Sequence, residues 1–326
     1  MTQWDKSMTS QNNQQKRAVH FSIILPVHNE EACLAEVIDR IIAAMSGTGQ
    51  TFEIICVDDG STDKSWNIIN KLNQEKSCVK GVKFLRNFGH QAAINAGIKE
   101  CAGQYISVLD ADGQDPPEIL PDMFKKCAQG YDVVYAVRKN RKENIFKRIG
   151  YKGFYRFYKL IVPFDVPLDS GDFSVFTRNV ADFLRSLPER NQFIRGLRSW
   201  YGGKQIDYAY DRQKRTAGRT KYGFKNLIVL AVNASISFSK IPLRWISCLG
   251  IIVSTLSFCA GLVIVVLKLT KDIPLLGWTS TIVVIIFFGG LNLFVLGIIG
   301  EYIGNIFDEV KNRPNFLIDQ RTDSEG

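Results

Sequence analysis

Short apolar runs alternate with amphipathic segments from Phe21 to about Arg138. The apolar runs have the length of buried strands, and the segments between them have helical periodicity. The pattern predicts strands at about 21–27, 52–57, 79–85, 105–110 and 132–137. It predicts helices at about 30–45, 62–75, 89–101 and 117–128. Strands that alternate with helices form a mainly parallel sheet covered on both faces, so we expect an α/β, Rossmann-like fold.

Two much longer apolar runs follow in the second half of the chain. Ile246–Leu267 and Trp278–Ile299 each contain 22 residues without a charge, and ten residues link them. Each run exceeds the ~20 residues that a helix needs to cross ~30 Å of hydrocarbon. Two buried core helices are the alternative, but two such runs in tandem are unusual in a globular core. We therefore expect a two-helix transmembrane hairpin over residues 246–300.

The hydropathy pattern divides the chain into five parts. We expect a disordered polar tail at 1–17, a soluble domain with interface helices at 18–225, and an amphipathic juxtamembrane segment at 226–245. The hairpin at 246–300 and a cytosolic tail at 301–326 follow. Residues 1–17 have no apolar region of the kind found in signal peptides. Lys and Arg flank the entry and exit of the hairpin, which favours a protein of the inner (plasma) membrane whose preceding domain is cytosolic.

The distribution of charge and the spacing of the cysteines limit the kinds of molecule that this chain is expected to bind. The formal net charge is +9, and Lys and Arg concentrate at 138–156 and 185–225, just before the apolar runs. A basic protein could bind nucleic acid, but this position favours anionic lipid headgroups and a lipid phosphate, so we expect no nucleic acid partner. A segment at about 146–160 mixes basic and aromatic residues as interfacial helices do. The seven cysteines form no C-x-x-C pair, which indicates neither a zinc site nor a disulfide framework.

Acidic residues follow three of the expected strands. Asp110 and Asp112 are spaced i, i+2 after one strand, Asp58 and Asp59 follow another, and Glu30 follows the first. Side chains at i and i+2 lie on one side of a strand, so the first pair can hold one hard cation through oxygen ligands. Ligands of such sheets bind beyond the carboxyl ends of the strands. One of these acids could instead cap a helix, since 61–63 is a typical N-cap sequence.

Together these junctions resemble those of family 2 glycosyltransferases of the GT-A fold, in particular the membrane-bound polyprenyl-phosphate glycosyltransferases. The resemblance extends from about Phe21 to about Pro314. No G-x-G-x-x-G motif is present, which disfavours a nicotinamide-binding Rossmann domain.

The resemblance implies roles for individual residues. Asp110 and Asp112 would coordinate Mg²⁺ or Mn²⁺ on the donor diphosphate, with Gln114 beside the metal or the acceptor phosphate. Asp58 and Asp59 would meet the nucleotide base, and Pro26 with Glu30 the ribose. A basic segment at 212–222 resembles the gating loop over the diphosphate, to which Arg212, Arg215 and Lys221 would contribute; the role of Arg219 stays open.

The acceptor side is expected to use a second group of basic residues. Candidates for the lipid phosphate are Arg138, Arg148, Lys152 and Arg198. The segment 193–200 resembles the Arg-Trp helix of processive family members, with Arg195 in place of their Gln. Asp172 would act as a base or orient the arginines. A phosphate monoester has a second pKa of about 6, so its attacking oxygen is already an anion near neutral pH and a strong base is less necessary.

The sequence therefore predicts an inverting enzyme that transfers one sugar from a nucleotide sugar to polyprenyl phosphate, undecaprenyl or dolichyl. UDP-glucose is the first choice of donor, with other UDP-sugars and GDP-mannose behind it, and a homo-oligomer is expected. A processive polysaccharide synthase is disfavoured because two spans give little wall for a polymer channel. A catalytically inactive anchor subunit would be expected to have lost the acidic residues of the metal site, which are present here.

Overall fold

The computed structural model describes residues 19–138, 170–189, 192–211, 241–270, 277–311 and 313–322. The chain divides into two compact units. The first comprises residues 1–142, 166–220 and 314–326, and the second comprises 143–165 and 221–313. The expected tail at 1–17 and interface helix at 146–160 lie outside the described residues.

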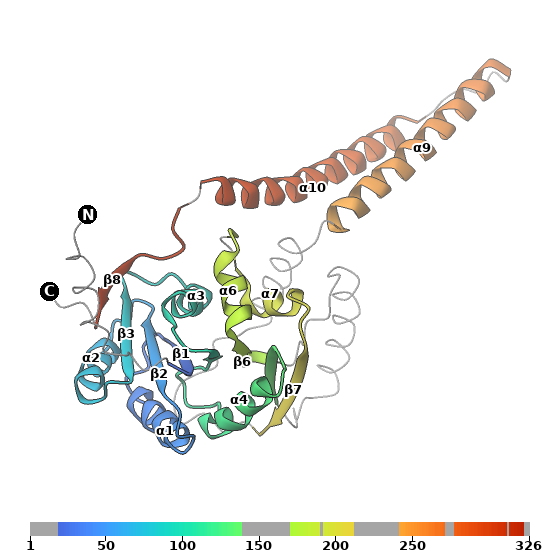
Figure 1. Ribbon diagram of the computed structural model, residues 1–326. Coiled ribbons are helices and arrows are strands. Elements are labelled where there is room, and N and C mark those ends of the chain that lie inside the picture. The colour runs from blue at the N-terminus through green and yellow to red at the C-terminus, as the bar shows by residue number, and fades with distance from the viewer. Residues whose placement is uncertain are drawn as a thin grey trace, which may run out of the picture. The chain divides into compact units, whose positions relative to one another are not determined.

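An eight-stranded sheet forms the centre of the first unit (Figure 1). Its order is β7-β5-β6-β4-β1-β2-β3-β8. Strands β1 to β4 are parallel to one another, whereas β6 and β8 run antiparallel to their neighbours. The bounds are β1 Phe21–Val27, β2 Phe52–Asp58, β3 Val79–Phe84, β4 Tyr105–Val108, β5 Val133–Arg138, β6 Ser170–Thr177, β7 Gln205–Tyr210 and β8 Ile318–Arg321. The expected mainly parallel sheet is confirmed.

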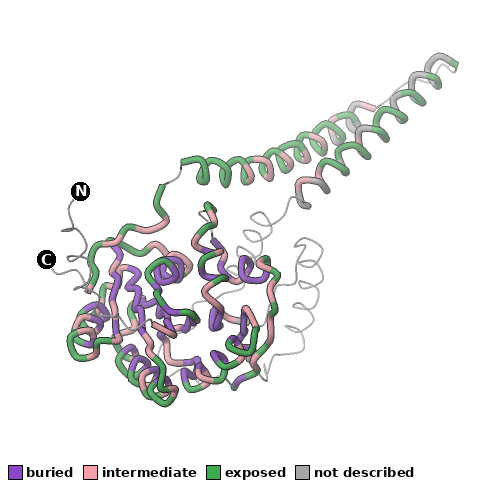
Figure 2. The backbone as a smooth tube through the Cα atoms, viewed as in Figure 1, coloured by how far each residue is buried: buried purple, intermediate pink, exposed green. Residues whose placement is uncertain are grey.

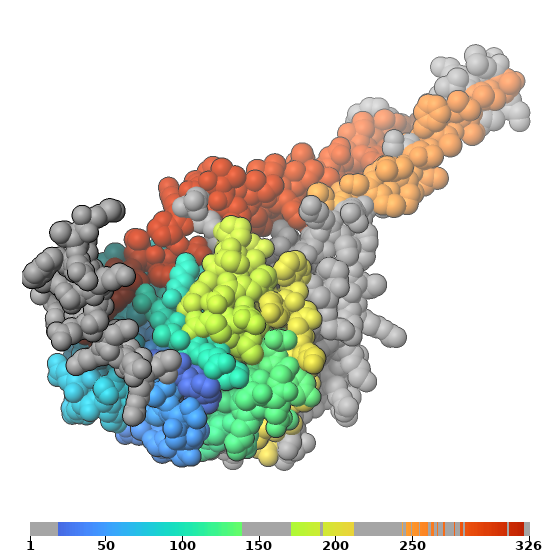
Figure 3. Space-filling view, in the orientation of Figure 1, coloured from blue at the N-terminus to red at the C-terminus, as the bar shows by residue number. Residues whose placement is uncertain are grey.

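Helices cover both faces of this sheet (Figure 1). One layer contains α1, α2 and α4, and the other contains α3, α6 and α7; α6 is on the face turned to the viewer in Figure 3. The bounds are α1 Leu34–Ser46, α2 Ser65–Glu75, α3 His90–Glu100, the 3₁₀ turn η1 Pro117–Ile119, α4 Leu120–Ala128, α6 Arg178–Ser186 and α7 Ile194–Trp200.

The core lies on both sides of β1, whose seven residues are all buried (Figure 2). Ile23 and Leu25 belong to the cluster that packs on α1 and α4. Ile24 points to the other face, where a Cβ added to Gly97 of α3 would lie 2.3 Å from its Cγ2. Only a glycine lets α3 approach the sheet this closely. A strand buried on both faces explains the continuous apolar run in the sequence.

The helix expected from residue 30 begins only at Leu34. The preceding residues instead join the loop after β2. Asn29 has a φ of 58°, and its Oδ1 accepts hydrogen bonds from Thr62 N at 2.8 Å and Thr62 Oγ1 at 3.2 Å. Glu30 N donates to Ser65 Oγ and Glu31 N to Asp63 Oδ2, both at 3.0 Å. Side chains of the second loop thus satisfy backbone groups of the first, which delays the helix.

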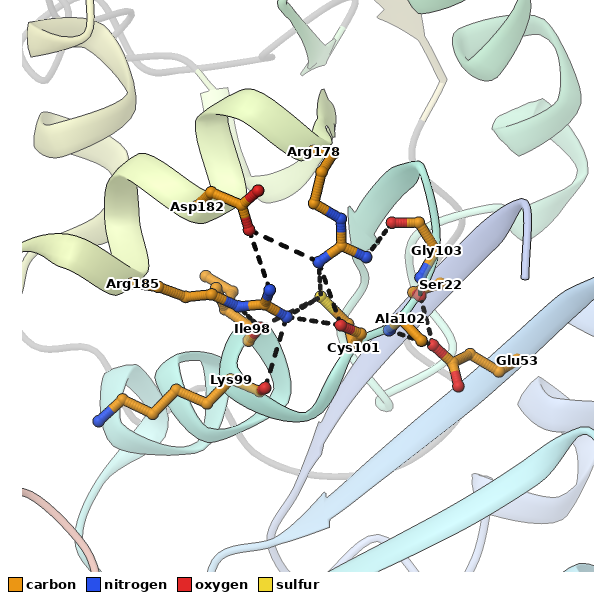
Figure 4. Close-up of polar contacts among 10 residues, drawn as sticks. All are labelled: Ser22, Glu53, Ile98, Lys99, Cys101, Ala102, Gly103, Arg178, Asp182 and Arg185. Atoms are coloured by element: carbon orange, nitrogen blue, oxygen red, sulfur yellow. Dashed lines mark hydrogen bonds and ion pairs between the residues drawn. The ribbon is translucent and has the colours of Figure 1, made fainter. Parts of the chain in front are cut away.

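Two arginines of α6 bind the C-terminal end of α3 (Figure 4). Arg178 donates to the carbonyls of Cys101 and Gly103, and Arg185 donates to those of Ile98 and Cys101. These carbonyls belong to the end of α3 and the turn into β4, where helix carbonyls lack partners within the helix. The two guanidinium groups therefore fix the C-terminal end of the helix whose first residue is His90.

The strand β8 was not expected, because the sequence indicated only a tail after the apolar runs. It pairs antiparallel with β3, with Val82 opposite Arg321. Thr322 and Gly81 exchange two hydrogen bonds of 2.9 and 3.0 Å, and the ring of Phe316 stacks on Phe84 with centroids 5.0 Å apart. Residues on the C-terminal side of the long helices therefore complete the edge of the catalytic sheet.

Two long helices belong to the second unit, α9 Ile241–Thr270 and α10 Trp278–Val310. Within the described ranges, one stretch is long and apolar enough to cross a membrane, Val284–Val310, and the apolar part of α9, Ile246–Cys259, is shorter. Large apolar side chains are exposed along both helices (Figure 2). The boundary expected at residue 300 falls inside α10, which continues to Val310. The second span of the expected hairpin stays a prediction.

Candidate functional site

The acidic junctions meet at one edge of the sheet, as expected. In the parallel register, Val27 of β1 lies opposite Asp58 of β2, and Ile24 of β1 lies opposite Val108 of β4. Strands β1, β2 and β4 therefore deliver their following loops to the same edge. This is the edge at which ligands of parallel sheets bind.

Asp58 and Asp59 occupy different environments after β2. Asp58 is fully buried; its Oδ1 accepts a hydrogen bond from Ser61 N at 3.0 Å, and its Oδ2 has no hydrogen-bond partner. Asp59 accepts from Phe88 N at 2.6 Å and from Gly89 N at 2.9 Å. Burial raises the pKa of Asp59 even though these bonds favour the carboxylate. Asp59 thus fixes the loop before α3, whereas one oxygen of Asp58 is buried without a hydrogen-bond partner.

Gly60 brings the loop after β2 into close contact with the loop after β3. Its φ is +63°, and an added Cβ would lie 2.4 Å from the carbonyl carbon of Arg86. Both the left-handed backbone and the close approach require glycine. The Asp-Asp-Gly sequence therefore sets the distance between the loops that follow β2 and β3.

Asp110 presents a carboxylate oxygen that has no hydrogen bond. Its Oδ1 is buried and lacks a hydrogen-bond partner, and His90 Nε2 lies 3.6 Å from it. Burial, together with the charges of Asp172, Asp115 and Asp112, raises the pKa of Asp110 to about 6, against the opposing effect of His90. Repulsion among four carboxylates favours a bound cation at this place.

The turn after Asp110 brings three further polar residues to the edge. Gln114 N donates to Asp112 Oδ1 at 3.1 Å, across Gly113 with its φ of +72°. Gln114 and Asp115 are both buried. The turn therefore holds Asp112 close to the end of β4, as its expected role beside Asp110 requires.

A chain of hydrogen bonds connects this turn to Arg138. Tyr210 OH donates to Asp115 Oδ1 at 2.5 Å and accepts from Arg138 Nε at 3.3 Å. Arg138 and Tyr210 lie opposite each other at the ends of β5 and β7. Arg138 is therefore linked through one phenol to the acidic turn.

Asp172 of β6 lies at the centre of a polar cluster. Arg195 of α7 binds both of its carboxylate oxygens at 2.8 Å, His90 Nε2 lies 3.2 Å from Oδ2, and Gln91 Nε2 lies 3.5 Å from Oδ1. The Asp172 side chain is 5% exposed. Since His90 also approaches Asp110, one imidazole links the two carboxylates. Burial opposes the charged form of His90, but the hydrogen bond that its Nε2 donates to Asp172 and the charges of Asp110 and Asp172 raise the pKa of His90.

Arg198 lies inside the protein rather than at a surface. It is fully buried, and its Nη1 donates to the carbonyl of Asp172 and to Ser174 Oγ. Its guanidinium also stands over the ring of Tyr135 at 5.4 Å. In this arrangement Arg198 supports the backbone of β6 at Asp172. Its Nε and Nη2 are buried and have no hydrogen-bond partner, and its expected contact with the acceptor phosphate stays a prediction.

Pro26 and Glu30 lie in and after β1, at the same edge. Pro26 is buried opposite Val57, past the last pair between β1 and β4. Cys33 Sγ donates to Glu30 Oε2 at 3.3 Å. The other expected site residues, Arg148, Lys152, Arg212, Arg215 and Lys221, lie outside the described residues, as does Arg219.

Four further residues of this edge were not predicted from the sequence: His90, Gln91, Asp115 and Tyr210. The first two had a usable signal, because they open the helix that follows a strand, at the same edge as the acids. Asp115 looked like part of a Pro-rich turn. Tyr210 gave no signal, because its contact with Asp115 depends on the pairing of β5 with β7.

Nowhere in the described parts of the chain do three His, Cys, Asp or Glu side chains gather as a metal cage. Two carboxylates at one edge do not form a complete coordination sphere for a divalent cation. Such an ion would need further ligands from a bound diphosphate, which is the usual arrangement for Mg²⁺ on substrate phosphates. The buried, unpartnered oxygen of Asp110 fits that requirement.

A solved structure supports the fold. The mannosyltransferase PcManGT from Pyrobaculum calidifontis, in complex with GDP-Man and Mn²⁺, matches with a TM-score of 0.50 and 17% identity. The match covers 67% of this chain and 63% of that one. At this identity the likeness concerns the α/β fold.

Relatives at higher identity extend over almost the whole chain. The glycosyltransferase YkcC of Bacillus subtilis is 42% identical over 303 residues, which cover 93% of this chain and 94% of that protein. A prophage-derived bactoprenol glucosyl transferase of Shigella flexneri is 35% identical and covers 91% and 96%. Residues 22–185 match Glycosyl transferase family 2. The sheet, its acidic edge and these matches lead to one conclusion: the chain is a glycosyltransferase and belongs to Glycosyl transferase family 2.

Proposed function

We propose that this enzyme transfers one sugar, glucose from UDP-glucose as first choice, to polyprenyl phosphate at the cytosolic face of the inner (plasma) membrane. The match to the bactoprenol glucosyl transferase of Shigella flexneri carries this proposal, because it covers 91% of the chain and so includes the long apolar helices as well as the sheet. A homologue of that kind from Escherichia coli is 34% identical over the same share of the chain.

The acidic edge supports metal-dependent transfer. Asp110 and Asp112 would hold Mg²⁺ or Mn²⁺, and Gln114 N keeps Asp112 in place at 3.1 Å. When bound, the ion would supply charge stabilisation to the departing nucleoside diphosphate. Asp58 and Glu30 would bind the nucleoside, and the buried oxygen of Asp58 that has no hydrogen-bond partner supports this role for Asp58. We assign the covering of the diphosphate to Arg212, Arg215 and Lys221.

Attack by an oxygen of the lipid phosphate at the anomeric carbon would invert its configuration. That oxygen is already an anion near neutral pH, so the site must mainly position two anions that repel one another. Arg138, Arg148 and Lys152 are the proposed partners of the lipid phosphate. Of these, Arg138 is described, and its contact with Tyr210 OH at 3.3 Å places it beside the acidic turn.

The pairing of β8 with β3 supports a two-span hairpin. The catalytic sheet lies before α9 in the chain, and its last strand lies after α10. A single crossing would separate β8 from β3 by the membrane, whereas two crossings return the chain to its starting side. An even number of spans therefore agrees with the sheet, and α9 with its 30 residues is long enough for the second.

A processive polysaccharide synthase remains the second candidate enzyme. Two membrane-spanning helices favour the transfer of a single sugar, because they provide little surface to line a polymer channel. An inactive anchor subunit is disfavoured by the intact acids at positions 58, 59, 110, 112 and 172. A homo-oligomer would give the two apolar helices neighbours in the bilayer.

One assay tests the proposal. Purified protein is incubated with polyprenyl phosphate, Mg²⁺ and a panel of UDP- and GDP-sugars, and both the released nucleoside diphosphate and the lipid product are measured. We expect one glucosyl lipid that appears with UDP-glucose, in equal amount to the released UDP. Products with several sugars would favour the synthase, and no lipid product with any donor would refute the proposal.

A further inference from the structure

The carboxylate of Asp172 has no room for a further hydrogen-bond donor. Its Oδ1 receives Arg195 Nε at 2.8 Å and Gln91 Nε2 at 3.5 Å. Its Oδ2 receives Arg195 Nη2 at 2.8 Å and lies 3.2 Å from His90 Nε2. Each oxygen thus has two partners. The fork of an arginine on both oxygens of a carboxylate is among the strongest polar contacts in proteins.

The same residue is also fixed through its backbone. The carbonyl of Asp172 accepts from Arg198 Nη1 at 3.2 Å and from Ser174 Oγ at 3.0 Å. Arg195 and Arg198 both belong to α7, so one short helix holds the side chain and the main chain of Asp172 together. The carboxylate therefore cannot turn away from Arg195 without a movement of α7.

Electrostatics agree with this geometry. Burial alone would raise the pKa of Asp172, but the charge of Arg195 and the contact with His90 hold that pKa well below its usual range. A carboxylate whose lone pairs are occupied in this way is a poor acceptor for a proton. A hydroxyl acceptor needs such a base when it attacks, whereas a phosphate anion does not.

We infer that Arg195 is a positioning residue that sets the acceptor chemistry of this enzyme, because it occupies Asp172 and so restricts the site to acceptors that attack as anions. The inference rests on the proposed function, in which the acceptor is a lipid phosphate. It assigns Asp172 an orienting role and gives a reason for arginine at a position where processive relatives have glutamine.

The two kinds of acceptor differ in whether a proton must be transferred. With a phosphate, one anionic oxygen forms a bond to the anomeric carbon, the bond from that carbon to the diphosphate oxygen breaks, and no proton moves. With water or an alcohol, the same bonds form and break, but the attacking oxygen must also lose a proton. With Arg195 removed, Asp172 Oδ1 or Oδ2 would be free to take that proton.

The test compares Arg195→Gln with the unmodified enzyme in two assays. The first measures transfer to polyprenyl phosphate, and the second measures hydrolysis of the donor and transfer to the matching polyprenol. We expect the variant to lose ~10-fold in the first assay, as for lost charge-assisted contacts. We expect it to gain at least ~10-fold in the second, at the low end of general-base effects. The double variant Arg195→Gln, Asp172→Asn should lose this gain.

Two further variants separate positioning from a structural role. Arg195→Lys keeps a charge but cannot bind both oxygens as a fork, so its ratio of the two activities should lie between those of the enzyme and Arg195→Gln. Arg321→Gln breaks another arginine–carboxylate pair, with Glu100 at 2.9 Å and at the far end of α3, and should leave the ratio unchanged. Donor affinity and thermal unfolding are measured for each variant.

The outcomes are distinct. A loss of both activities in Arg195→Gln and Arg195→Lys, with an unchanged ratio, would overturn the inference. So would a gain in hydrolysis that persists when Asp172 is replaced. If the unmodified enzyme uses no lipid phosphate at all, the proposed function fails instead, and that result is visible before any variant is made.

Discussion

The indole Nε1 of Trp66 donates a hydrogen bond to Oε1 of Gln320 at 3.0 Å. This contact joins α2, near the beginning of the catalytic unit, to β8, which follows the last long helix. The two residues must therefore lie on the same side of any membrane that α9 and α10 cross.

The first prediction concerns that topology. A cysteine in place of Thr270, at the end of α9, should react with an impermeant maleimide added outside intact cells. Cysteines in place of Asp319 on β8 or of Thr9 should react only after the membrane is opened. The unmodified chain is the control, because Cys248 and Cys259 are exposed along α9. Labelling of position 319 from outside would contradict the even number of crossings.

The second prediction concerns the metal. Asp112→Asn keeps the volume of the side chain but removes its charge, and it should reduce turnover by at least ~100-fold, as for loss of a dominant electrostatic stabiliser. Its melting temperature should be close to that of the unmodified enzyme, because the residue lies in a turn. Excess chelator should abolish activity, and added Mg²⁺ or Mn²⁺ should restore it. Full activity in chelator would remove the metal from the mechanism.

The third prediction separates the two basic clusters. Arg215→Ala should weaken binding of the nucleotide sugar and leave binding of polyprenyl phosphate nearly unchanged, since a charge-assisted hydrogen bond to phosphate is worth ~1.5 to 3 kcal/mol. Arg148→Ala should do the reverse. Each substrate is titrated against each variant. Equal losses for both substrates in both variants would show that this division of the basic residues is wrong.

The fourth prediction concerns stability. Asp63 accepts hydrogen bonds from Ser65 N at 2.9 Å and Glu31 N at 3.0 Å, so it stabilises the start of α2 and the loop before α1. Asp63→Ala should lower the free energy of unfolding by about 1 kcal/mol at pH 7, as for loss of a helix cap. Denaturant titration measures the difference, and an unchanged free energy of unfolding in Asp63→Ala would contradict this role.

The same variant has a defined pH dependence. The hydrogen bonds to Asp63 lower its pKa from 3.8, although burial opposes this. The carboxylate therefore stabilises the folded protein at pH values above 3.8, and this contribution is lost as the pH falls through the lower pKa of the folded state. The difference between the enzyme and Asp63→Ala should shrink on acidification and not on alkalinisation.

The parts of the structure that depend on local pattern were predictable. The strands β1 to β5 and the helices between them follow from apolar periodicity, and the meeting of Asp58 with Asp110 at one edge follows from parallel pairing. The late start of α1 was not predictable, because Asn29 and Glu30 find partners 33 and 35 residues away. Contacts between distant segments, such as Asp115 with Tyr210, leave no periodic signal in the sequence.

The position of Arg198 illustrates a further limit. A sequence in which arginines precede an apolar region suggests contacts with anionic lipid, and Arg138 and Arg198 look alike in this respect. The structure distinguishes them, since Arg138 is partly exposed at the end of β5 whereas Arg198 is fully buried beside Tyr135.

The place of β8 in the chain also determines the order in which the protein can be built. Until the residues after α10 leave the ribosome, the outer edge of β3 has no strand beside it and offers free backbone groups, a recognised starting point for aggregation. The catalytic unit can be closed only after both apolar helices have been synthesised. Maturation of the enzyme is thereby tied to the completion of its two long apolar helices.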